Sequence, residues 1–149
     1  MDISIRPYGA PDLERIIDIW IEGHDSTGLP RIPIINAERL RSEIPERVNK
    51  GSHVIYVACS QNELVAFVIF WADRLDQLFV HPRFQRNGIG KKLLQFAQSV
   101  RPHGYWLYAL AANDGANRFY QREGLQRIGT EIEPELGIDL VRYGWKPTG

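Results

Sequence analysis

The first 50 residues carry hydrophobic side chains at helical spacing. Five of these side chains after residue 12 are separated by three or four positions, which predicts one apolar face of a helix. They are Leu13, Ile16, Ile17, Trp20 and Ile21. Ala10-Pro11-Asp12 opens this helix, because proline fits a first turn and acidic groups favour the positive end of a helix. A short strand over residues 2–6 precedes it, and a second helix, weakened by Pro45, is predicted over residues 37–49.

From residue 53 onwards, short apolar runs alternate with turn residues, a pattern typical of strands. His53–Cys59 and Leu64–Trp71 predict a β-hairpin that turns at Ser60–Glu63. Further strands are predicted at 74–81, 104–111, 125–132 and 138–145, and helices at 88–101 and 115–123. The order is strand, two helices, three strands, helix, strand, helix, two strands. It predicts an α/β (α+β) fold with a largely antiparallel start.

The composition is that of one globular domain over residues 1–149. Hydrophobic residues make up 44% of the 149 residues, enough to build a core. The formal net charge is zero, which argues against a dedicated nucleic-acid binder. The charge is unevenly spread, however: residues 1–76 hold 8 basic and 12 acidic residues, whereas residues 77–113 hold 5 basic residues and no acid. The acid-free stretch predicts a local site for an anionic ligand.

Several classes of protein and site are excluded by what the sequence lacks. Cys59 is the single cysteine, so no intrachain disulfide and no cysteine-based zinc site is expected. The four histidines are scattered without metal-ligand spacing, and we expect no metal. The N-terminus lacks the apolar run of a signal peptide, and the most apolar stretch, Leu64–Ala72, is too short to span a bilayer. We expect a soluble cytoplasmic protein that does not bind membranes.

The acid-free stretch contains a strand, a loop with two glycines, and then a helix. Unpaired N–H groups at a helix start favour a phosphate, and glycine lets the backbone approach it closely. The nucleotide P-loop pattern fails, because its first glycine falls on Gln85 and Lys92 stands where serine or threonine is needed. The dinucleotide pattern fails as well, because its third glycine falls on Leu93.

Two motifs resemble those of the GCN5-related N-acetyltransferase (GNAT) family. Gln85-Arg86-Asn87-Gly88-Ile89-Gly90 is similar to the family's acetyl-CoA pyrophosphate loop, and Leu78-Phe79-Val80-His81-Pro82 to the strand end before it. The stretch 113–125, Asn-Asp-Gly-Ala-Asn-Arg-Phe-Tyr-Gln-Arg-Glu-Gly-Leu, is similar to the family's second motif and departs only in its final leucine. The resemblance covers nearly the whole chain and is strongest to small bacterial acetyltransferases of unassigned substrate. It implies a mixed, mostly antiparallel sheet of six to seven strands with about four flanking helices.

The same resemblance implies which residues hold acetyl-CoA, the acyl donor. The backbone of Leu78 and Val80 is expected to bond the pantetheine arm, and the Val80 N–H to polarise the thioester carbonyl. Asn113 either bonds the same arm or serves as a turn and helix cap. The implied acetyl-CoA residues are Leu78, Phe79, Val80, Gln85, Arg86, Asn87, Gly88, Ile89, Gly90, Lys91, Asn113, Ala116 and Phe119. Phe119 is also expected to pack its helix onto the core.

Acetyl transfer needs a proton for the leaving thiolate and a route for the proton of the attacking amine. The resemblance implies that Tyr120 is the general acid, since a phenol can protonate a thiolate of comparable basicity. Asp76 is a candidate base that shares strand phase with Leu78 and Val80, but it can equally be a surface acid or an ion pair with Arg74. His24, acting through water, is a second candidate.

The amine acceptor is expected at the end of the first predicted helix. Trp20, Glu22, His24 and Asp25 cluster there, and Trp20, His24 and Asp25 are our candidate acceptor contacts. Acidic groups there and at Asp76 suit a small-molecule or peptide amine. Peptide N-terminus, lysine, polyamine, aminoglycoside and amino acid all stay open.

We expect direct attack on acetyl-CoA in a ternary complex, because Cys59 lies mid-strand, away from both motifs. The alternative is a non-catalytic acyl-CoA-binding or regulatory domain, against which the presence of Tyr120 argues. Dimers are common in the family, so a homodimer through the last strands is a further expectation.

Overall fold

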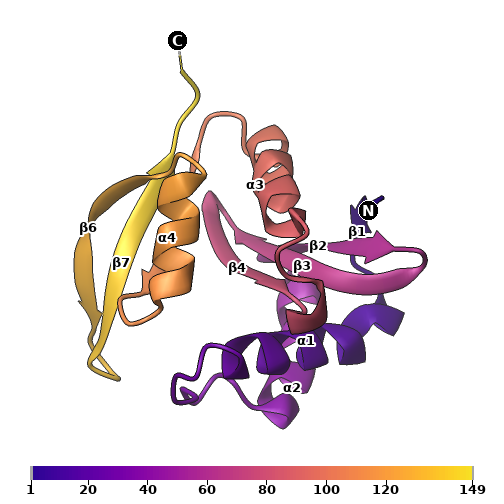
Figure 1. Cartoon of the computed structure of the whole chain (residues 1–149). Coiled ribbons are helices and arrows are strands. Elements are labelled where there is room, and N and C mark those ends of the chain that lie inside the picture. Colours follow the sequence, from indigo (N-terminus) through magenta and orange to yellow (C-terminus); the bar gives the residue numbers. More distant parts are fainter. Residues whose placement is uncertain (1, 149) are drawn as a thin grey trace.

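The computed structural model describes residues 2–148, and its strands form one seven-stranded sheet of order β1-β2-β3-β4-β5-β7-β6 (Figure 1). The strands are β1 (Ser4–Pro7), β2 (His53–Ser60), β3 (Glu63–Trp71), β4 (Arg74–Val80), β5 (Tyr105–Leu110), β6 (Gln126–Glu133) and β7 (Ile138–Trp145). Every neighbouring pair is antiparallel except β4 and β5, which run parallel. The predicted strand order along the chain and the mostly antiparallel sheet are confirmed.

Four α-helices cover the two faces of this sheet. They are α1 (Leu13–Asp25), α2 (Ala37–Lys50), α3 (Ile89–Val100) and α4 (Asp114–Arg122). Side chains of α1 and α2 pack on one face with Ile55, Val57 and Phe67, and side chains of α3 and α4 pack on the other with Val68 and Leu107. Figure 1 shows α1 and α2 together on one side of β2, β3 and β4, with α3 on the other. Each half of the core therefore belongs to one pair of helices.

Strand β3 lies at the centre of this sandwich. Its residues from Leu64 to Phe70 are all buried, which explains why the sequence there is a continuous apolar run rather than an alternating one. The predicted hairpin with β2 is confirmed, and Gln61 and Asn62 take positive φ values of 51° and 66° in its two-residue turn. Such a turn matches the twist of the two strands that it joins.

At the helices, the start of α1 differs from the prediction, whereas α2 is confirmed. Pro11 belongs to a short 3₁₀ turn, η1 (Ala10–Asp12), and the α-helix begins after it at Leu13. Helix α2 runs through Pro45 to Lys50, although proline removes one helical hydrogen bond. The Asn36 side chain accepts from the Arg39 N–H at 3.0 Å at the start of α2, and Leu40 and Ile44 are buried beneath it. Capping and burial together offset the cost of the proline.

Candidate active site

Strands β4 and β5 separate almost as soon as they pair. One register pair joins them, Arg74 with Trp106, and the Trp106 N–H donates to the Asp73 carbonyl at 3.2 Å. Beyond that pair, β5 continues beside β7 and β4 continues beside β3. The backbone edge of β4 from Asp76 to Val80 is therefore left without a strand partner on the β5 side.

The backbone of Leu78 and Val80 faces this open edge. The His81 N–H donates to the Val65 carbonyl at 2.8 Å, so this end of β4 is hydrogen-bonded to β3 at His81 and, by alternation, at Phe79. Leu78 and Val80 lie between these positions and turn their N–H and C=O groups away from β3. The Val80 carbonyl accepts from Gln85 Nε2 at 3.1 Å. The groups expected to bond the pantetheine arm thus point to the open side.

The glycine loop leads from β4 to the start of α3. After the short 3₁₀ turn η2 (Pro82–Phe84), Arg86 takes a φ of +67° and Gly88 a φ of +74°, both in the left-handed region. This is uncommon for arginine, and such backbone strain is often found at ligand sites. Asn87 Nδ2 donates to the Phe84 carbonyl at 3.1 Å and holds the loop closed. The loop therefore presents exposed backbone directly before a helix N-terminus.

Side chains in this loop take different roles. Arg86 and Lys91 are exposed and can neutralise a phosphate, whereas Ile89 is 1% exposed and packs in the core, so only its backbone can reach a ligand. At Gly90, a Cβ would lie 3.0 Å from Phe119 Cζ. Gly90 thus lets α3 approach the aromatic ring from α4, and the two sequence motifs meet at this contact.

The second motif begins at a capped helix start. Asn113 Oδ1 accepts from the Ala116 N–H at 3.1 Å, so the cap role of Asn113 is confirmed. Its Nδ2 donates to no described residue and is free to bind a ligand. Asn117, which was not expected as a site residue, donates from Nδ2 to the carbonyls of Leu110 at 3.0 Å and Asn113 at 2.8 Å. Its side chain fixes the turn between β5 and α4.

Tyr120 lies near the C-terminal end of the same helix and lines the cleft described below. It is 9% exposed, and burial, with a smaller contribution from Tyr143, raises its pKa to about 12. None of the described residues hydrogen-bonds its hydroxyl. The phenol is thus protonated across the physiological range, as a proton donor must be.

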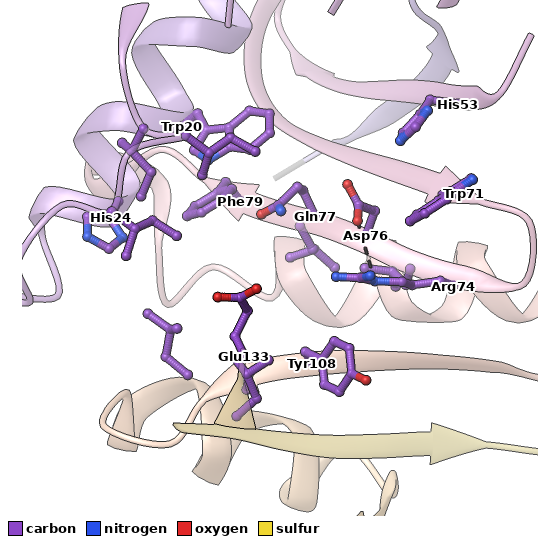
Figure 2. Close-up of a pocket in the computed structure, with 18 of the residues that line it drawn as sticks. Trp20, His24, His53, Trp71, Arg74, Asp76, Gln77, Phe79, Tyr108 and Glu133 are labelled. Atoms are coloured by element: carbon purple, nitrogen blue, oxygen red, sulfur yellow. Dashed lines mark ion pairs between the residues drawn. The ribbon is translucent and has the colours of Figure 1, made fainter. Parts of the chain in front are cut away.

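The phase predicted for Asp76 is wrong. The β3–β4 register shifts between Ile69 and Phe70, which places a bulge at Asp76. Leu75 therefore shares the α3 side of the sheet with Leu78, whereas Asp76 and Gln77 both lie on the α1 side with Phe79 (Figure 2). A pattern of strict alternation cannot reveal a bulge, because the extra residue inverts the phase of everything before it.

Asp76 is paired and mostly buried. Its Oδ1 lies 3.4 Å from Arg74 Nε, and its side chain is 12% exposed. Of the alternatives left open by the sequence, the ion pair with Arg74 is therefore present. Figure 2 shows this pair on the wall of the cleft.

Two of the three candidate acceptor residues on α1 reach the cleft. Trp20 is buried against Phe79, with the ring centroids 5.9 Å apart. His24 is 4% exposed, and its Nε2 donates to the Pro30 carbonyl at 3.0 Å, which leaves Nδ1 as the nitrogen that can accept. Asp25 does not line the cleft, because Arg31 binds its carboxylate at 2.7 and 2.9 Å. This contact holds the pKa of Asp25 below its usual range.

These residues line one cleft of about 930 Å³ between α1, α2, β4 and the β6–β7 turn. The lining residues that were not expected from the sequence include His53, Trp71, Tyr108 and Glu133 (Figure 2). They come from β2, β3, β5 and β6, and no local motif marks them. The Glu133 carboxylate accepts from the backbone N–H groups of Glu135 at 3.2 Å and Leu136 at 2.6 Å, so it also shapes the turn.

His53 stacks on Trp71, with the ring centroids 5.5 Å apart. Burial lowers the pKa of His53, and the nearby Arg47 and Arg74 act in the same direction, whereas Asp76 opposes them. The ring is therefore held in its neutral form at pH 7.

Other kinds of site are not found within residues 2–148. These residues contain no group of three or more side chains placed to hold a metal ion. None of their helices is long and apolar enough to cross a membrane.

Comparisons with known proteins add independent information. A family model described as an acetyltransferase (GNAT) domain matches residues 51–127. The peptidyl-lysine N-acetyltransferase YiaC of Escherichia coli (strain K12) is 30% identical over 153 aligned positions, covering 95% of each protein. The peptidyl-lysine N-acetyltransferase YjaB of Salmonella typhimurium (strain LT2) is 30% identical, covering 92% of each. Among solved structures, the PaiA N-acetyltransferase of Thermoplasma acidophilum in complex with coenzyme A has a TM-score of 0.77 at 21% identity. That match covers 97% of this chain and 100% of the other, so the two share a fold.

Proposed function

Since this chain belongs to the GNAT family of acetyl-CoA-dependent N-acetyltransferases, we propose that residues 1–149 form one catalytic domain that acetylates a primary amine held in this cleft. The observation that carries the proposal is the open edge of β4. This edge leads from the glycine loop to the cleft, where the buried Tyr120 supplies a hydroxyl group. Bound acetyl-CoA supplies an activated acetyl thioester to the amine. Binding of the donor and transfer of the protons depend on residues of this chain.

The residues that would hold acetyl-CoA fit its chemistry. The exposed backbone before α3, with Arg86 and Lys91 beside it, suits the pyrophosphate. The outward N–H and C=O groups of Leu78 and Val80 suit the amides of the pantetheine arm, and we propose that the Val80 N–H polarises the thioester carbonyl. Asn113, whose Nδ2 donates to no described residue, also lines the cleft.

We propose that Tyr120 donates the proton that the thiolate takes as it leaves. On the side of the cleft opposite Tyr120, Asp76 binds the ammonium form of the acceptor amine. Asp76 then accepts the proton that the amine loses and passes it to solvent. His24 keeps the Pro30 segment in place through Nε2, with Nδ1 available to bind water. Direct attack by the amine needs no covalent enzyme intermediate, and the single Cys59 is buried in the core on β2.

For the acceptor we propose the side chain of a lysine in a peptide or protein. The names of the relatives YiaC and YjaB support this class. The cleft offers an apolar wall at Trp20 and Phe79 for the lysine methylenes, and carboxylates at Asp76 and Glu133 for its charged end. The cytoplasmic location and the homodimer stay predictions. Fractionation checks the first, and light scattering on the purified protein checks the second.

The proposal is tested by measuring free-thiol release from acetyl-CoA with a panel of amines. We expect Tyr120→Phe to lower kcat by about 10²-fold or more, because proton donation contributes on the order of 10²–10⁴-fold. The KM for acetyl-CoA is expected to stay near the wild-type value, since the ring and its packing remain. Unchanged turnover would remove Tyr120 from the mechanism.

Tyr105→Phe is the matched control. Tyr105 lies in the same core but does not line the cleft, and its hydroxyl is buried without a hydrogen-bond partner. Removing that hydroxyl is expected to leave kcat unchanged and to be neutral or stabilising. If both variants lost activity alike, the effect on Tyr120 would be one of packing.

A further inference from the structure

Arg74 lies in the wall of the cleft, where three aromatic rings contact its guanidinium group. It is the first residue of β4, and its side chain is 25% exposed. Its guanidinium carbon lies 4.9 Å from the ring centre of Tyr108, 5.3 Å from that of Trp106 and 5.9 Å from that of Trp71. Such contacts hold a planar cation in one orientation without using its hydrogen-bond donors.

Those donors make no hydrogen bond to the part of the chain that the structure describes. Arg74 donates no hydrogen bond to any of residues 2–148, and its buried Nε is unpartnered apart from the ion-pair contact with Asp76 Oδ1 at 3.4 Å. A guanidinium offers five N–H groups, and leaving the buried Nε–H of Arg74 without a hydrogen bond costs free energy. The unused donors in the cleft point to an acceptor group on a ligand.

Other arginines of the chain hydrogen-bond a carboxylate. Arg6 binds Asp12, Arg31 binds Asp25 and Arg41 binds Glu14, each through two hydrogen bonds of 2.7–2.9 Å to one carboxylate. All three of these arginines lie outside the cleft. Arg74 faces the cleft and lacks such a partner.

We propose that Arg74 binds a carboxylate on the acceptor, so that the enzyme prefers an amine with a carboxylate beside it. The inference rests on the proposed function, because it concerns the same acceptor. Arg74 and Asp76 present a positive and a negative group next to each other, which is complementary to an ammonium and a carboxylate that are themselves adjacent. The fork of the guanidinium matches the two oxygens of a carboxylate.

The other charged groups of the cleft do not take this role. Arg47 lies on α2 within an ion pair with Glu43 at 3.3 Å, and Lys50 pairs with Glu46 at 2.8 Å. Glu133 is bound by two backbone amides. Arg74 is therefore the cleft-lining arginine in residues 2–148 that donates no hydrogen bond to a carboxylate, whereas Arg47 donates one to Glu43.

Two sources can supply an amine beside a carboxylate: a peptide lysine next to glutamate or aspartate, and a free amino acid. The experiment compares two peptides that differ only in Lys-Glu against Lys-Gln, together with a free amino acid. It measures kcat/KM by thiol release for the wild type, Arg74→Gln and Arg74→Lys. Arg47→Gln is the matched control, because it removes a positive charge from the same cleft that already has a partner.

We expect the wild type to favour the Lys-Glu peptide by about tenfold or more, as hydrogen bonds to charged groups imply. In Arg74→Gln this preference should fall to about one, with the Lys-Gln peptide still acetylated. Arg74→Lys should keep part of the preference, since it keeps the charge but loses the fork. Arg47→Gln should keep all of it. A preference for the free amino acid over both peptides would assign the carboxylate to that source.

The proposal is overturned if the wild type treats both peptides alike and has no advantage with the amino acid. It is also overturned if Arg74→Gln, with a melting temperature like that of the wild type, loses activity equally on every amine. That result would mean that Arg74 only positions Asp76 and does not bind a carboxylate of the acceptor. Absence of thiol release with every amine would instead contradict the proposed function, so the two failures are distinguishable.

Discussion

At the scale of single residues, the wall of the cleft depends on a close approach at Gly23. This glycine lies in α1, where a Cβ would meet Phe79 Cδ1 at 2.7 Å. The Phe79 ring cannot move aside easily, because Trp20 and Phe67 flank it at centroid distances of 5.9 and 5.8 Å. The first helix can therefore lie against β4 only if this position has no side chain.

We predict that Gly23→Ala destabilises the protein by about 1–3 kcal/mol, the usual cost of overpacking a core. Helix propensity alone predicts the opposite, since alanine is favoured over glycine in a helix by about 1 kcal/mol. Urea unfolding of both proteins measures the difference. We also expect the KM of the acceptor amine to rise, because Phe79 lines the cleft.

Gly115→Ala is the control for helix propensity. Gly115 lies in α4 and is exposed, and a Cβ at this position would have no neighbour closer than 3.7 Å. This variant should be as stable as the wild type or slightly more so. A stabilised Gly23→Ala would show that α1 packs less closely on Phe79 than described.

At the scale of elements, the entry into α1 is fixed by one buried acid. Asp12 is 8% exposed and accepts from Arg6 at 2.8 and 2.9 Å and from the Gly9 N–H at 2.8 Å. These bonds join β1 to the turn η1. The hydrogen bond from Arg6 holds the pKa of Asp12 below its usual range, against the opposing effect of burial.

A lowered pKa in the folded state means that Asp12 stabilises the protein above its unfolded-state pKa of about 4. This contribution is lost as the pH falls through the lower, folded-state value. We therefore predict that Asp12→Asn is less stable than the wild type at pH 7 and that the gap narrows below about pH 4. Unfolding curves from pH 7 to pH 2 measure it, and a gap that is independent of pH would contradict the role of the charge.

The two motifs also act at the scale of elements. Gly90 on α3 lies against Phe119 on α4, since a Cβ added at Gly90 would lie 3.0 Å from the ring, so the helix that follows the glycine loop and the helix that carries Tyr120 pack together. The Gly90–Phe119 contact therefore joins the two motifs in space.

At the scale of the whole molecule, the sheet consists of two parts joined at a narrow seam. Strands β1–β4 form one part and β5–β7 the other, and a single register pair links them. A ligand that bonds the open edge of β4 and the N-terminus of α4 would bridge the two parts. Ligand binding should therefore be visible as global stabilisation.

We predict that acetyl-CoA raises the melting temperature and that ATP at the same concentration does not. A ligand at a hundred times its Kd stabilises a protein by about 2.7 kcal/mol. A thermal-shift titration measures this effect, and Tyr120→Phe should shift to the same extent as the wild type. A shift with ATP alone would contradict an acetyl-CoA site.

Much of this architecture could be predicted from the sequence, because the deciding information is local. The apolar run of β3, the helical spacing in α1 and the strand–loop–helix pattern around Gly88 each reflect burial or backbone geometry within one element. The GNAT motifs identified the family in the same way. They are local because backbone N–H groups and glycines bind the donor, and neighbours along the chain supply them.

The acceptor side was decided only by the tertiary structure. The bulge at Asp76 and the binding of Asp25 by Arg31 depend on how neighbouring segments pair and turn, and Arg74 meets the rings of Trp106 and Tyr108 from β5, which is distant in sequence. Sequence spacing cannot specify such contacts, because they depend on how strands twist, pair and separate. The sequence by itself therefore determined the donor and the fold, whereas the packing of α1, α2, β4 and the β6–β7 turn decided the shape and charge of the acceptor cleft.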